Sequence, residues 1–282
     1  MARTIHNGHR ATRAFAALPF ILLLAALLLW PLGVLALRSL SGDTGFGVGE
    51  YLAVITTPRY WRALFNTLLL ALVSTTLALV ICIPAAVYIE LGDSRDRRVL
   101  AVLLSIPLSL PGIVIGFFVI LYFGNAGVVP QLFEILTGER QLNIAYSFGG
   151  LLLGYVYFQI PRVVLVVRGA VAGIAPETLA VARTLGAAAW RVYLHVVLPT
   201  LRPAILSAAA LSMATALGAF GTAATLSRGY RVLPLEIAAA FTERFEPGRA
   251  AALSVLLALG TTLFLVAANR LALPRTTARD DS

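Results

Sequence analysis

The residues that could carry chemistry in this chain gather in one late segment, VARTLGAAAWRVYLHVVLP, at residues 181–199. Arg183, Arg191 and His195 interrupt an otherwise apolar run, and Pro199 closes it. These side chains supply neither a paired nucleophile and base nor a set of metal ligands. The segment therefore predicts a binding surface rather than a reaction centre.

Catalysis is also disfavoured by where the ionisable residues fall. An intramembrane protease needs a Ser and His, or two Asp, within its spans, but all three histidines lie outside the long apolar stretches and no stretch centre holds Asp. All 22 basic residues are Arg, and a chain without lysine cannot contain the G-x-x-x-x-G-K-[ST] loop that holds nucleotide phosphates. The single cysteine, Cys82, offers neither a disulfide framework nor a zinc site. We expect no enzyme activity, no cofactor and no metal.

The composition places this segment in a membrane protein. Hydrophobic residues make up 59% of the 282 residues and charged residues 12%, against about 25% charged in ordinary globular domains. The net charge of +9 would suggest nucleic acid in a soluble chain. In a membrane chain the positions of the basic residues indicate first which side of the membrane each loop faces. We therefore expect one all-α membrane domain that contacts a lipid bilayer and binds no nucleic acid.

Six stretches contain the roughly 20 apolar residues that a transmembrane helix needs. They leave tails at 1–13 and 272–282 and a long loop at 169–202. The side that includes the N-terminus carries 13 Arg and the opposite side 8, with Arg162 left inside a span, which predicts that both termini are cytoplasmic. The predicted spans within the membrane domain at 14–271 are 14–37, 64–89, 99–122, 148–168, 203–226 and 250–271.

Several residues inside these spans are polar or break helices. Arg162 falls near the end of the fourth span, from which it could reach the headgroups. Pro107 and Pro111 in the third span, like the small residues of the fifth, suit either a cavity or ordinary close packing. The candidates for lining a pathway, each of which could equally pack between helices, are Gln159, Ser212, Thr215 and Phe220.

The loop at 169–202 contains a predicted short helix. Pro176 and Glu177 are typical of a helix start, Leu179 to Leu185 can continue it, and Gly186 can end it. Its apolar and small side chains suit docking into a groove of another protein. They also suit lying passively on lipid headgroups, and the residues alone leave both uses open.

The end of this loop resembles a known family. Its pattern is similar to the EAA loop in the membrane subunits of ATP-binding-cassette (ABC) importers, and "ARTLGA" at 182–187 resembles the branch with polyamine, ferric iron, molybdate and phosphonate permeases. Residues 66–89 and 105–117 resemble the same permeases. The family's glutamate would fall at Ala180, and Glu177 lies one turn earlier. The matching positions are Gly186, Ala187, Trp190, Tyr193, Val196, Leu198, Pro199 and Pro203.

The resemblance implies a type I importer (MetI-like) permease fold in the bacterial inner membrane. It implies two cytoplasmic ABC ATPase subunits, a second permease copy or paralogue, and an extracytoplasmic solute-binding protein as partners. The solute suggested by the likeness is of the spermidine/putrescine type, and an ion-coupled secondary transporter or channel is the alternative. The residues implied to couple to the ATPase are Glu177, Leu179, Ala182, Arg183, Leu185, Gly186, Ala187, Trp190, Leu198 and Pro199.

Overall fold

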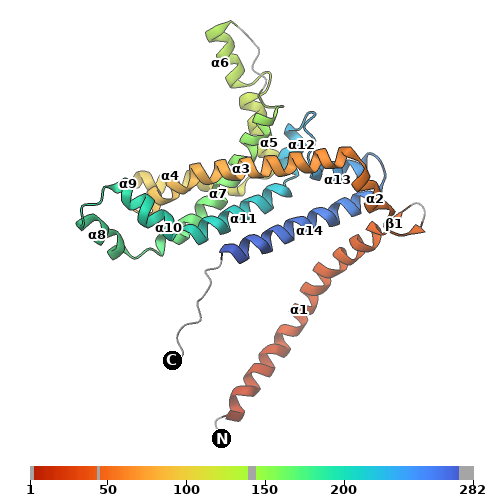
Figure 1. Cartoon of the computed structure of the whole chain (residues 1–282), viewed down its shortest axis with the longest axis horizontal. Helices are drawn as coiled ribbons and strands as arrows, with labels where there is room; N and C mark the ends of the chain where they lie inside the picture. The colour runs from red at the N-terminus through yellow and green to blue at the C-terminus, as the bar shows by residue number, and fades with distance from the viewer. Residues whose placement is uncertain (1–2, 43–44, 139–143, 273–282) are drawn as a thin grey trace. The chain divides into compact units, whose positions relative to one another are not determined.

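The computed structural model describes residues 3–42, 45–138 and 144–272, so all but the first residue of the predicted tail at 272–282 lies outside the described residues. The chain divides into two compact units (Figure 1). One comprises Met1–Thr57 with Ile237–Leu256, and the other Pro58–Glu236 with Leu257–Ser282. The second unit contains every residue of the candidate site, and each unit is described by itself.

The first unit is built on one long helix. α1 (Arg3–Ser39) contains the predicted span 14–37 and extends through the basic segment before it. Between the first two predicted spans the structure forms a two-stranded hairpin and a short helix, and Gly45, the first residue of the second strand, adopts a φ of +113° that favours glycine. The Ser39 hydroxyl and the Tyr51 hydroxyl lie 2.7 Å apart. The further elements are β1 (Ser41–Gly42), β2 (Gly45–Phe46) and α2 (Gly49–Thr56), with parts of α13 (Leu233–Thr242) and α14 (Pro247–Ala272).

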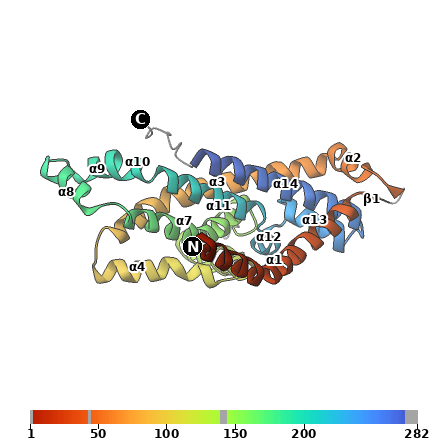
Figure 2. The ribbon, with the colours of Figure 1, turned by 90° about the horizontal axis from the view of Figure 1, so that it is seen from below.

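The second unit is a helical bundle. Its central helices, α3 (Pro58–Glu90), α7 (Phe148–Ala172) and α11 (Arg202–Leu217), pack side by side (Figures 1 and 2). The remaining elements are α4 (Arg95–Ser105), the 3₁₀ turn η1 (Ile106–Ser109), α5 (Gly112–Phe123), α6 (Val128–Thr137), α8 (Pro176–Thr184), α9 (Ala189–Val192), the π-helical turn η2 (Tyr193–Val197), α10 (Leu198–Thr200) and α12 (Gly221–Leu226).

Two buried clusters hold these helices together. The loop-side cluster joins the last half of α3 and of α7 to Leu179, Val197 and Leu201. The far cluster joins the first half of α3 and of α7 to the end of α11 and to α12. Since lipid is as apolar as these side chains, close van der Waals packing rather than burial from water stabilises the contacts.

A polar contact joins α3 to α7 between apolar neighbours. Gln159 is fully buried, its Nε2 donates to Ser74 Oγ at 2.7 Å, and its Oε1 accepts from Thr75 Oγ1 at 3.1 Å. An amide left unpaired in a membrane helix is costly, so these two bonds fix the register of the pair. The geometry favours a packing role for Gln159.

Two predicted spans are not continuous helices. The span 99–122 breaks at 106–111, where Pro107 and Pro111 interrupt the backbone hydrogen bonds, and the span 203–226 breaks at 218–220. The other predicted spans fall within α1, α3, α7 and α14. Among the described residues, five helical segments are long and apolar enough to cross a membrane, or up to six if the bent pair Ala189–Thr200 and Arg202–Leu217 counts as one span.

That bent pair also changes the end of the predicted loop at 169–202. Residues 189–200 are helical and meet α11 at an angle of 67°. Pro203 lies in the first turn of α11, where its missing N–H costs no hydrogen bond. Proline therefore begins a new helix after the bend rather than leaving an irregular loop.

A seam of small residues allows α5, α7 and α12 to approach closely. A Cβ on Gly116 would lie 1.7 Å from Thr225 Oγ1, and a Cβ on Gly154 would lie 2.7 Å from Thr222 Cγ2. Only glycine fits at these positions without moving a neighbouring helix. Small and short polar residues commonly line the interfaces of membrane helices, where they allow the backbones to approach closely.

We predict that Gly116→Ala destabilises the bundle by about 1–3 kcal/mol, the usual cost of overpacking. Thr225→Ala removes the atom that the new methyl group would meet, so the double variant should regain part of the loss. The measurement is the melting temperature of the purified protein in detergent. Equal melting temperatures of Gly116→Ala and wild type would contradict the claim that close packing at Gly116 requires glycine.

Candidate functional site

The segment after α7 forms a compact helical projection on the bundle. α8 begins at Pro176 and ends at Thr184, close to the helix predicted from the sequence. Leu179 is only 8% exposed and packs in the loop-side cluster with Val171 and Val192. Leu179 therefore anchors α8 to its own chain.

Gly186 ends α8 in the manner that the sequence predicted. Its φ is +80°, a left-handed conformation that costs other residues about 1–2 kcal/mol. The Ala187 N–H donates to the Ala182 carbonyl at 3.2 Å, the long hydrogen bond of a Schellman cap. Ala182 and Ala187 both pack against the loop-side cluster. The cap thus turns the chain back towards α9.

The outward side of this projection is apolar. Leu185 is 82% exposed and lies directly before the glycine, while Val181 and Trp190 are also exposed. Glu177 is exposed at the start of α8, and the side chain of Arg183 lies outside the described residues. Leu198 and Pro199 are half-buried in the helical turn before α11. Of the predicted set, Leu185 and Trp190 are therefore the large apolar side chains available to a partner.

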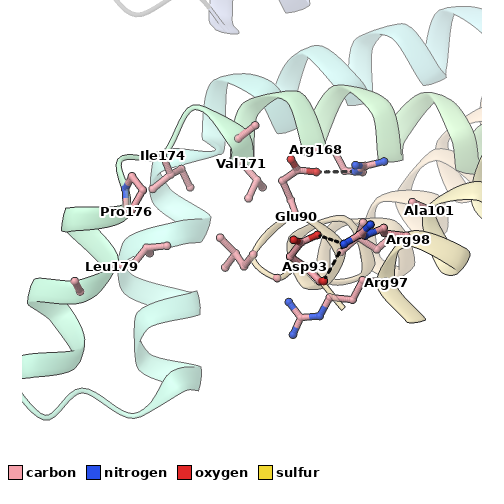
Figure 3. Close-up of a pocket in the computed structure, with 15 residues that line it drawn as sticks. Glu90, Asp93, Arg97, Arg98, Ala101, Arg168, Val171, Ile174, Pro176 and Leu179 are labelled. Carbon is pink, nitrogen blue, oxygen red and sulfur yellow. Dashed lines mark hydrogen bonds and ion pairs between the residues drawn. The ribbon is translucent and has the colours of Figure 1, made fainter. Parts of the chain in front are cut away.

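A charged hollow of about 800 Å³ lies between α8 and the turn from α3 to α4 (Figure 3). The Arg168 Nε donates to Glu90 Oε2 at 2.8 Å, linking the ends of α7 and α3. Arg98 pairs with Asp93 at 2.9 Å beside Glu90, facing α8 across the hollow (Figure 3). Sequence reasoning missed this hollow, because the pairs form only when the ends of separate helices meet.

A second cavity, of about 340 Å³ and open on one side, lies where the two broken spans meet. It brings together two of the four predicted lining residues, Thr215 and Phe220. The other two, Gln159 and Ser212, are fully buried and do not line it, and the Ser212 hydroxyl has no hydrogen-bond partner. Its other lining residues are Gly112, Phe158, Arg162, Ala214, Gly218, Ala219, Gly221 and Thr222.

Arg162 lines this cavity and lies well inside its helix rather than near the helix end. Because α7 continues to Ala172, Arg162 lies about 21 Å along the helix from Phe148 and about 15 Å from its last residue. The guanidinium lies 4.0 Å from the centre of the Phe158 ring and donates to the Phe158 carbonyl. Phe158 is one turn towards the start of α7, the direction in which helical side chains lean. The expectation of a terminal, headgroup-seeking arginine was wrong.

The carbonyl groups exposed by the two breaks are paired by neighbouring side chains. The Tyr155 hydroxyl donates to the Ala219 carbonyl at 2.8 Å, and Thr222 Oγ1 donates to the Gly112 carbonyl at 3.1 Å. Broken helices are tolerated at membrane depth when such partners exist. Both bonds hold cavity walls in place. Within the described residues, no three His, Cys, Asp or Glu side chains gather as metal ligands.

Comparison with known proteins identifies the fold and the family. Residues 82–275 match the model of the binding-protein-dependent transport system inner membrane component. The chain belongs to this family. It is therefore a multi-pass transport protein of the inner membrane and not an enzyme, and the alternative of an ion-coupled secondary transporter or channel is not supported.

Two relatives illustrate the resemblance to other transport permeases. The molybdenum transport system permease protein ModB of Mycobacterium bovis is 32% identical over 222 residues, covering 77% of this chain and 81% of the relative. The sulfate transport system permease protein CysT of Escherichia coli (strain K12) is 29% identical, covering 89% of each chain. These relatives do not support the spermidine/putrescine specificity predicted from the loop.

Solved structures show the same fold. A chain of a bacterial ABC transporter involved in the import of the acidic polysaccharide alginate matches with a TM-score of 0.82 at 17% identity, covering 96% of this chain and 98% of that one. A chain of the MetNI methionine ABC transporter in an inward-facing conformation matches with a TM-score of 0.59 at 18% identity, covering 77% and 97%. The permease therefore has the MetI-like type I fold that the sequence predicted.

We predict that Tyr155→Phe destabilises the permease by about 1–3 kcal/mol, because it leaves the Ala219 carbonyl unpaired. Tyr157→Phe is the matched control, since the described part of the chain gives the Tyr157 hydroxyl no hydrogen-bond partner. Melting curves of both variants in detergent compare the two losses. Equal losses, or none for Tyr155→Phe, would argue against the role of this bond at the break.

Proposed function

We propose that this permease forms the solute pathway of an ABC importer and couples to a separate ATPase through residues 177–199. The observation that carries this proposal is the shape of α8. Leu179 fixes one side of the helix to the bundle, while Gly186 turns the chain so that Leu185 stands free at the tip. A helix with a buried anchor and an apolar tip suits docking into a groove.

The proposed assembly follows from the family and from the absence of lysine. No phosphate-binding loop exists in the chain, so ATP is hydrolysed on other subunits, two of them in the proposed complex. A second permease copy or paralogue completes the pathway, and a soluble binding protein delivers the solute. One solved relative of the same fold was determined with its periplasmic protein bound to alginate pentasaccharide. The arginine distribution supports cytoplasmic termini and a cytoplasmic 169–202 segment.

The proposed solute is a small tetrahedral oxyanion such as molybdate or sulfate. Relatives named for these two solutes span most of the chain. The cavity within the bundle is lined by Arg162 and by no carboxylate. A polycation would meet an unfavourable charge there, whereas a dianion would meet a favourable one.

The coupling proposal predicts that Gly186→Ala weakens association with the ATPase. The left-handed backbone costs the alanine about 1–2 kcal/mol, so the cap relaxes in the free permease and must be restored on docking, which lowers association by up to about 5–30-fold. Leu185→Ser should also weaken association because it removes the apolar tip. Copurification of the co-expressed ATPase measures both effects.

Gly173→Ala is the matched control, because Gly173 lies before α8 with an ordinary φ of −82°. This variant should retain wild-type association. The docking proposal fails if Gly186→Ala and Leu185→Ser both retain full association while the proteins remain folded.

The solute proposal predicts ATP-dependent uptake of radiolabelled molybdate or sulfate. Proteoliposomes would contain the permease with its ATPase, and the cognate binding protein would be added outside. Spermidine at the same concentration should neither be taken up nor compete. Uptake of spermidine with no oxyanion transport would reverse the assignment.

A further inference from the structure

We infer that Arg162 forms an anion-binding station inside the permease, which the oxyanion contacts during passage. This inference rests on the proposed function and names the group within the membrane that recognises the solute. Arginine inside a membrane helix is costly and is usually retained for a pathway or a partner. The position of Arg162 on a cavity wall supports the pathway.

Arg162 differs from other arginines of the structure in what it contacts. Arg168, on the same helix, pairs with Glu90 at 2.8 Å, and Arg59 pairs with buried Glu236 at 2.7 Å. Within the described residues, Arg162 has no carboxylate partner; it lies over an aromatic ring and donates to a carbonyl of its own helix. These contacts orient the guanidinium but leave its positive charge uncompensated.

The walls of the cavity leave recognition of an anion to this one side chain. The Thr215 hydroxyl donates to the Leu211 and Ser212 carbonyls at 2.9 Å, and the Thr222 hydroxyl donates to the Gly112 carbonyl. Neither hydroxyl has a second proton to give to an oxyanion. A guanidinium, by contrast, presents several N–H donors in a planar fork that fits two oxygens of one anion.

The size of the cavity suits passage rather than tight capture. Its volume is about 340 Å³, and one water occupies about 30 Å³ in the liquid. A tetrahedral oxyanion therefore fits together with part of its hydration shell. With one charged group in a cavity large enough to hold water as well, the station favours dianions by charge and still lets them leave.

The test uses the complete transporter, reconstituted in proteoliposomes with its ATPase and binding protein. We expect Arg162→Gln to lower the maximal rate of molybdate or sulfate uptake at least tenfold. The half-saturating concentration of loaded binding protein should not change, because Arg162 lies inside the bundle and not on a docking face. Arg162→Lys should lose clearly less than Arg162→Gln, since it retains the charge but not the planar fork of donors.

Arg270→Gln is the matched control, because it removes an exposed arginine at the end of α14 and should transport like wild type. Phe158→Leu tests the support beneath the guanidinium and should reduce uptake less than Arg162→Gln. If uptake by Arg162→Gln is within twofold of wild type, the proposal that Arg162 binds the oxyanion during transport is wrong. Equal losses in the Gln and Lys variants would also contradict it, because they would indicate a structural role for the arginine.

Uptake by the wild-type transporter distinguishes a failure of the proposed solute from a failure of the anion-binding role of Arg162. If wild-type proteoliposomes take up no oxyanion, the proposed solute is wrong and the station falls with it. If the wild type transports an oxyanion and Arg162→Gln does so equally well, only the station is wrong.

Discussion

The close approach of two broken spans at a pair of glycines determines the interior of the bundle. α5 begins at Gly112 after one break, and α12 begins at Gly221 after the other. A Cβ on Gly221 would lie 3.0 Å from the Ile113 nitrogen, and one on Gly112 would lie 3.0 Å from Thr222 Oγ1. Larger residues at these positions would push the starts of α5 and α12 apart. The hydrogen bond from Thr222 to the Gly112 carbonyl would then be lost, and the shape of the cavity would change. Irregular backbone is tolerated at membrane depth only where protein or a wet cavity surrounds it, and here both conditions are met.

The same bundle links this cavity to the projection at the other end of α11. The loop-side cluster packs Leu179 of α8 with Val197 and Leu201, which lie at the bend before α11. The far end of α11 supplies Thr215 to the cavity wall. Packed contacts along α11 therefore connect α8 with the wall of the proposed anion station. The π-helical turn Tyr193–Val197 at the bend is of a kind that often accompanies functional sites.

The features that could be predicted from the sequence are those with local causes. Pro176 and Gly186 mark the ends of α8 because proline favours a first helical turn and glycine a left-handed cap. Long apolar runs likewise predict α1, α3, α7 and α14. Pro107 and Pro111 marked a helix irregularity in the third predicted span, but the groups that stabilise both breaks, such as the Tyr155 hydroxyl and Thr222, come from elsewhere in the chain and could not be predicted. The burial of Leu179 and the exposure of Leu185 could not be predicted either, because they depend on which face of α8 packs against the bundle.

The relatives do not support the polyamine prediction, and the position of the residues that suggested it explains why they were a weak guide to the solute. The residues that suggested it lie in the 182–187 segment, whose exposed side we propose to meet an ATPase rather than a solute. A segment of that kind constrains the partner that drives transport and carries little information on what is transported. The charge within the cavity bears directly on the solute, and it comes from Arg162, whose direction depends on the extension of α7 to Ala172 and on the ring of Phe158. On the proposed function, the charge at Arg162 is therefore a more direct guide to the solute than the sequence of the 182–187 segment.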